Sequence, residues 1–82
     1  MNETITWLDN TYRQAFEEET RGIERRRQHD PNLTPEDIQG TLNTLYVQQG
    51  NNSDGRGSFA DAVLSATIAA YEMYIEKWKN EV

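Results

Sequence analysis

The chain has 82 residues, no cysteine, and fourteen acidic against eight basic side chains, which gives a net charge of −6. The lack of cysteine excludes a disulfide framework, a thiolate zinc site and a cysteine nucleophile, and the negative charge disfavours nucleic acid and anionic lipid as partners. No stretch approaches the roughly 20 apolar residues that span a bilayer, and no basic, apolar leader opens the sequence. We therefore expect a soluble cytoplasmic protein without membrane contact.

A first helix is expected over residues 4–28. Apolar side chains recur there at the three- and four-residue spacing of one helical face: Ile5, Leu8, Tyr12, Ala15, Phe16 and Ile23. The helix should end at His29 and Asp30, because Pro31 disfavours helical backbone in the residue before it.

A second helix is expected over residues 35–49. Thr34 offers a hydroxyl cap, Pro35 suits the first helical position, and two acidic residues follow in the first turn. Gly50 is expected to end the helix. One narrow apolar face predicts a helix that lies on a core rather than inside it: Ile38, Leu42, Leu45 and Tyr46.

Residues 50–57 are polar and rich in glycine, which suits a connection between helices. A third helix is expected over residues 58–79, opened by Ser58 with Asp61 three residues later as a shortened capping box. The sequence shows no strand pattern and no internal repeat.

The third helix is apolar around most of its circumference, so it should lie at the centre of the core. Two apolar stripes run along it. One comprises Phe59, Ala62, Val63, Ala66, Ala70, Met73 and Tyr74. The other comprises Leu64, Ile68, Tyr71, Ile75 and Trp78. Two other helices give such a helix little cover.

We therefore predict one all-α domain over residues 1–82, a three-helix antiparallel bundle completed by dimerisation. A chain of this size buries only about 60–65% of its unfolded surface, and a two-fold homodimer is the commonest assembly. The dimer contact is expected at Leu64, Ile68, Tyr71, Ile75 and Trp78, or at Phe59, Val63, Ala70 and Tyr74. One tryptophan, Trp7 or Trp78, is expected at a subunit or partner contact.

Arg56, Gly57 and Ser58 are the candidate ligand-binding residues, because a glycine-rich loop before a helix presents N–H donors to an anion. The alternative is a plain turn in which Arg56 is solvated or pairs with Asp54. The lysine and glycine spacing of a nucleotide-binding P-loop is lacking. A calcium loop is excluded because its bidentate glutamate position falls on Val63.

Glu19 is a candidate buried polar residue, since it lies in the middle of the first helix's apolar face. Arg26 continues the same face, and Arg26 or a hydroxyl from Tyr46 or Tyr74 is its expected partner. We prefer this structural role to that of a general base or metal ligand, because a single carboxylate makes no catalytic set.

Three consecutive arginines, Arg25 to Arg27, occupy the last turns of the first helix, where exposed carbonyls favour cations. They point in different directions around the helix, so we expect no nucleic-acid binding. His29 has only Asp30 beside it and no further ligand at a recognisable spacing, so we expect no metal.

The sequence contains no reactive constellation, so we expect no enzyme, no catalytic residue and no cofactor. The leading hypothesis is a non-enzymatic module that associates with itself or with another protein, because the chain combines a large apolar surface with acidic faces. Two alternatives remain open: a small-ligand or anion-binding protein that uses the loop from Gly55 to Ser58, and an acidic regulator that binds a basic partner.

Overall fold

The structure is a computed structural model that describes residues 3–51 and 57–81. These residues form three helices, α1 (Glu3–His29), α2 (Pro35–Asn51) and α3 (Ser58–Lys79), and no strand lies among them. The expected all-α, three-helix fold is confirmed. The observed bounds differ from the expected ones by at most two residues, at the end of α2, which continues through Gly50 to Asn51.

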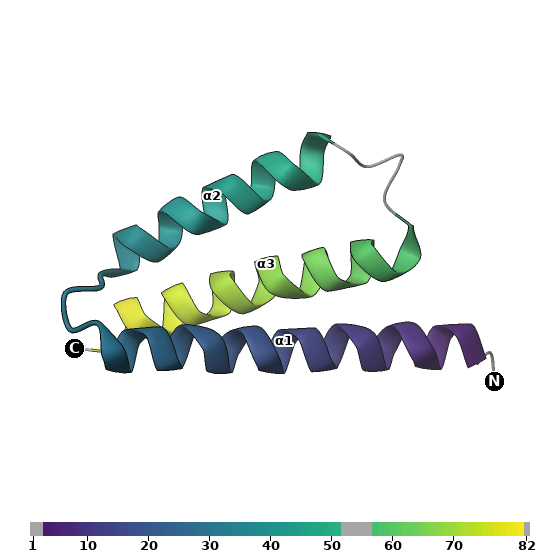
Figure 1. Cartoon of the computed structure of the whole chain (residues 1–82), viewed down its shortest axis with the longest axis horizontal. Helices are drawn as coiled ribbons and strands as arrows, with labels where there is room; N and C mark the ends of the chain where they lie inside the picture. Colours follow the sequence, from purple (N-terminus) through teal and green to yellow (C-terminus); the bar gives the residue numbers. More distant parts are fainter. Residues whose placement is uncertain (1–2, 52–56, 82) are drawn as a thin grey trace.

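α3 lies between the other two helices (Figure 1). It packs against both α1 and α2, whereas no Cα atom in the described part of α1 comes within 8 Å of one in α2. The chain reverses direction twice, so α2 runs antiparallel to both neighbours while α1 and α3 run the same way (Figure 1). The central position expected for the third helix is confirmed.

The three helices form a wedge rather than a parallel stack. α2 approaches α3 where α2 begins and α3 ends, and diverges from it toward the other end of the molecule (Figure 1). We call the first of these ends the closed end and the second the open end. The molecule measures 43 × 28 × 21 Å along its principal axes.

The hydrophobic core lies at the closed end. It combines the end of α1, the following turn, the first half of α2 and α3 from its middle onward. Its buried members are Ile23, Leu33, Ile38, Leu42, Ile68, Tyr74 and Ile75. The first buried residue of α3 is Ala66, and Leu64 before it packs against the core while partly exposed. The buried core therefore lies toward the closed end.

The turn and the cap before α2 explain why the chain reverses at the closed end. The backbone amide of Asn32 donates to Asp30 Oδ1, and Leu33 then turns into the core. Thr34 caps α2 as expected: its Oγ1 accepts from the amide of Asp37, and the Asp37 carboxylate accepts from the amide of Thr34. This reciprocal pair satisfies two amides at the helix start.

The start of α3 differs from the expectation. Gly57, with φ of 35°, is the residue before the first helical turn, and no side chain caps the helix there. Ser58 is already helical, and the amide of Asp61 donates to the Gly57 carbonyl. Glycine adopts this positive φ without the steric cost that a side chain would bring.

The contact between α1 and α3 follows a row of side chains four residues apart on α3. The row consists of Ala62, Ala66, Ala70, Tyr74 and Trp78. Ala66 and Ala70 are fully buried, and Tyr74 and Trp78 contact Arg27 of α1. Rows with this spacing wind around a helix, so two helices that pack along them cross at an angle.

The same winding corrects the expectation of a buried Glu19–Arg26 pair. The covered positions on α1 shift from Leu8 near its start to Ile23 and Arg27 near its end. Arg26 is left exposed and Glu19 is only half-buried, and no polar or charged side chain among the described residues is buried. The expectation assumed a straight apolar face along α1, whereas the crossing of α3 moves that face around the helix.

Candidate functional site

Large apolar side chains are exposed mainly at the open end. Among the residues whose side chains the structure describes, this set is Trp7, Tyr12, Tyr46, Val47, Phe59 and Met73. All except Met73 belong to the first half of α1, the second half of α2 or the start of α3, which together form the open end. Exposed aromatic side chains gathered in one region are typical of interaction surfaces.

Two adjoining hollows at the open end form a groove along one face of α3. They have volumes of about 390 and 480 Å³ and share Phe59 and Val63 as their floor. The α1 wall is formed by Thr11, Gln14, Ala15, Glu18 and Glu19. The α2 wall and the rest of the floor are formed by Leu45, Gln48, Ala60, Leu64 and Thr67. We call this surface the Phe59 groove.

The Phe59 groove continues the face of α3 that the closed end covers. Phe59, Val63, Ala70 and Tyr74 share that face by their helical spacing. Tyr74 is 1% exposed, whereas Phe59 is 57% exposed. The difference arises because α1 and α2 both approach α3 near Tyr74 and lie on opposite sides of it near Phe59. Along this face Tyr74 and Ala70 are covered and Phe59 is exposed, while Ala66 between them is fully buried and Met73 at the edge of the face is 43% exposed.

An aromatic pair marks the α1 side of this groove. The ring centroids of Trp7 and Phe59 lie 5.8 Å apart with the planes tilted by 40°, a favourable geometry for aromatic rings. Both side chains remain about half exposed, Trp7 at 49%. The pair therefore holds α1 to α3 and also presents apolar surface to a partner.

A third hollow, of about 680 Å³, lies on the opposite face of α3. It is lined by Leu8, Asp9, Tyr12, Gln49, Ser58, Asp61, Ala62 and Ser65. Asp9 and Asp61 place two carboxylates in this hollow beside Ser58. Of the other residues expected to bind an anion, Gly57 is exposed, and Gly55 and Arg56 lie outside the described residues.

The structure separates the two stripes expected to form a dimer contact. In one, Ile68 and Ile75 are buried in the core, and Leu64, Tyr71 and Trp78 pack against it within the single chain. In the other, Ala70 and Tyr74 are buried, Val63 is half-buried and Phe59 is exposed. Of the nine residues in the two expected contacts, Phe59 alone therefore offers a large exposed side chain to another molecule.

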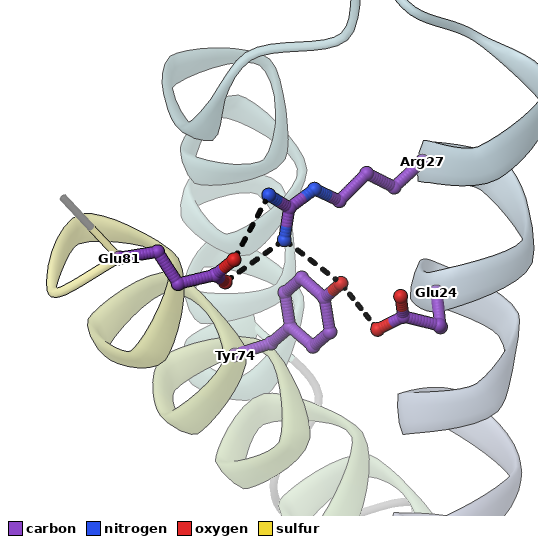
Figure 2. Close-up of polar contacts among 4 residues, drawn as sticks. All are labelled: Glu24, Arg27, Tyr74 and Glu81. Atoms are coloured by element: carbon purple, nitrogen blue, oxygen red, sulfur yellow. Dashed lines mark hydrogen bonds and ion pairs between the residues drawn. The ribbon is translucent and has the colours of Figure 1, made fainter.

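A polar cluster at the closed end was not anticipated from the sequence. The Tyr74 hydroxyl donates to Glu24 Oε2 at 2.5 Å and accepts from Arg27 Nη1 at 3.4 Å. Arg27 also donates to both carboxylate oxygens of Glu81, at 2.9 and 3.2 Å (Figure 2). Its guanidinium lies 4.0 Å from the centroid of the Trp78 ring. These contacts fasten the end of α3 to α1.

Tyr74 was among the partners expected for Glu19, whereas in the structure its hydroxyl pairs with Glu24 and Arg27. The signal available in the sequence was the spacing of Glu24 and Arg27, three residues apart on one side of a helix. Tyr71 is the tyrosine near Glu19 instead: burial and the Glu19 charge raise the pKa of Tyr71, while Arg26 lowers it. The winding of the α1 face explains both changes of partner.

The cluster changes the acidity of its members. Burial, and then the hydrogen bond to Glu24, raise the pKa of Tyr74 above its ordinary value of 10. The hydrogen bond from Arg27 lowers the pKa of the exposed Glu81 carboxyl. Outside the cluster, the hydrogen bond from Tyr46 to Glu72 raises the pKa of Tyr46.

Replacement of Tyr74 by phenylalanine should lower the free energy of unfolding by about 1–2 kcal/mol at neutral pH, because two hydrogen bonds are lost near the core. A raised tyrosine pKa stabilises the fold fully below pH 10, and this contribution is lost as pH rises through the folded-state pKa. Urea titrations of wild type should therefore show stability falling in alkali, and Y74F should show a smaller fall. Y12F, at an exposed tyrosine, is the control and should match wild type.

The described residues contain no group of three or more histidine, aspartate or glutamate side chains placed to hold a metal ion. His29 is exposed. No helix in the same part of the chain is long and apolar enough to cross a membrane. No protein-family model matches the chain, and neither the search of curated proteins nor the search of solved structures returns a match.

Proposed function

We propose that this protein is a non-enzymatic protein-interaction module whose contact surface is the Phe59 groove. The observation that carries the proposal is the unequal cover of one face of α3, buried at Tyr74 and bare at Phe59. An exposed apolar centre surrounded by polar residues is the typical composition of a protein contact site. Exposed aromatic anchors such as Trp7 and Phe59 contribute strongly to such contacts when a partner covers them.

The closed end supports a structural rather than a catalytic role for its polar cluster. Tyr74 is 1% exposed, and its hydroxyl is engaged by Glu24 and Arg27. A substrate would have to displace the side chains of Glu24 and Arg27 to reach this hydroxyl. The core at this end is complete within one chain, so a partner adds to the fold at the open end only.

Self-association through the same groove is the second candidate. The exposed pair of Trp7 and Phe59 on a chain of 82 residues favours it, since two-fold dimers are the commonest way in which small chains cover spare apolar surface. Of the residues expected in the dimer contact, this candidate retains Phe59 and Val63. It predicts a molar mass that rises toward twice the chain mass as protein concentration increases.

The proposal is tested with F59E, and M73E is the matched control, since Met73 is exposed on α3 outside the groove. Each variant adds one negative charge to an exposed position of the same helix. Immobilised wild type and M73E should retain at least one common protein from a cell extract, or a second copy of the chain. F59E should retain about tenfold less of that partner, because an aromatic anchor contributes about 1.4 kcal/mol or more to the free energy of binding.

Circular dichroism should show the same helix content in all three proteins. The proposal is contradicted if F59E and M73E retain the same proteins in equal amounts. It is equally contradicted if wild type stays monomeric and retains nothing that F59E lacks.

A further inference from the structure

The walls and length of the Phe59 groove suit a helix. α1 and α2 flank its floor, and the floor runs along α3 from Phe59 to Thr67, a distance of about 12 Å or roughly two helical turns. The described residues contain no strand whose edge could pair with an extended peptide. An amphipathic helix laid in the groove would place its apolar side chains on Phe59 and Val63. The bound helix would cover Phe59 in the way that α1 and α2 together cover Tyr74 at the closed end.

The charge of the groove selects among possible helices. Glu18 and Glu19 lie on its α1 wall, and none of the described residues that line it is lysine, arginine or histidine. The one described cation in the open half of α1 is Arg13, and its guanidinium donates to Asn10 Oδ1. A helix with cations beside its apolar stripe therefore meets complementary charge, whereas an acidic helix meets repulsion.

The same charges disfavour a second copy of the chain in this groove. A two-fold contact brings the same surface from both copies together, so each copy would place its own Glu18 and Glu19 in the interface. Among the described residues that line the groove, none is a cation that could offset them. Like charges held together at an interface oppose association.

We propose that the Phe59 groove binds a basic amphipathic helix of another protein, with Glu18 and Glu19 facing its lysine or arginine side chains. This inference rests on the proposed function and names the chemistry of the partner. Trp7 and Phe59 anchor the apolar stripe of the bound helix. The bound helix then completes the open end as a fourth helix.

The probe is a synthetic helical peptide of about 18 residues, with leucine at the spacing of one helical face and lysine on the rest of its surface. A second peptide has glutamate at every lysine position. Amide shifts of the whole, isotopically labelled chain are followed during titration with each peptide. The lysine peptide should shift amides of α1 around Glu18 and of α3 around Phe59 and Val63, and the glutamate peptide should leave them in place.

Variants separate specific pairing from attraction by net charge. The double variant E18Q/E19Q removes the two groove carboxylates, and E36Q/E76Q removes two exposed carboxylates elsewhere with the same change in charge. E18Q/E19Q should weaken binding of the lysine peptide about five- to tenfold at low salt. E36Q/E76Q should weaken it less than twofold.

Three results overturn the inference. The first is that the glutamate peptide binds the groove as tightly as the lysine peptide. The second is that both double variants weaken binding equally. The third is that no lysine peptide, in a set with varied leucine positions, shifts the groove amides. If in any of these cases F59E still loses a partner or a dimer that M73E keeps, the proposed function stands and only the partner chemistry is wrong. If F59E and M73E also behave alike, the proposed function fails as well.

Discussion

Replacement of Ile38 by alanine should lower the free energy of unfolding by about 2–4 kcal/mol. The Ile38 side chain is 0% exposed, packed in the core at the start of α2, so its loss removes buried apolar surface and leaves a cavity. A chain of this length has a total stability of about 4–12 kcal/mol. The variant should therefore lose a large part of that stability in urea unfolding followed by circular dichroism.

V47A is the control for I38A on the same helix. Val47 is 61% exposed at the open end of α2, so its truncation should change the free energy of unfolding by less than about 0.5 kcal/mol. Equal losses in I38A and V47A would contradict a core confined to the closed end.

Replacement of Ala70 by leucine should lower the free energy of unfolding by about 1–3 kcal/mol. Ala70 is 0% exposed in the row of α3 side chains that faces α1, and a larger side chain there must push the two helices apart. Displacement of α1 would also strain the contacts of Tyr74, one turn further along α3, with Glu24 and Arg27. Thermal and urea unfolding of A70L should both show the loss.

A60L provides the contrast, since Ala60 is exposed on the floor of the Phe59 groove. The added side chain there meets solvent rather than α1, so stability should change by less than about 0.5 kcal/mol. A loss in A60L as large as that in A70L would show that the first turns of α3 are covered in the isolated chain.

The helices were predictable because their signals are local. Pro31 and the cap at Thr34 fix the end of α1 and the start of α2, and both observations follow from the chemistry of single residues. The apolar circumference of α3 also predicted its central place, since such a helix needs neighbours on both sides. These features depend on neighbouring residues along the chain and not on how the helices cross.

The pairing of side chains between helices was not predictable in the same way. A helical wheel treats the apolar face of α1 as straight, and on that basis Arg26 continues the face of Glu19. The structure shows a face that winds, so Arg27 takes the inward position and binds Tyr74 and Glu81. The crossing of α1 and α3 depends on the fully buried alanines of α3. The sequence alone does not show which helix these small side chains face.

The candidate site was only partly predictable for a related reason. Phe59 and Val63 stood out as members of an apolar stripe, but so did Tyr74 on the same face. Which end of that stripe is covered depends on where α2 diverges from α3, which local patterns do not encode. The groove thus became visible only when the helices were placed together.

Amide hydrogen exchange along α3 in the dilute, isolated chain tests the unequal cover of this helix most directly. Residues 61–64 should open with a free energy at least about 2 kcal/mol below that of residues 72–75, because few side chains cover the open end and the core covers the closed end. Such a gradient is the result expected for a face that is bare near Phe59 and buried near Tyr74. Equal protection at both ends would contradict it, since the first turns of α3 would then be covered without any partner.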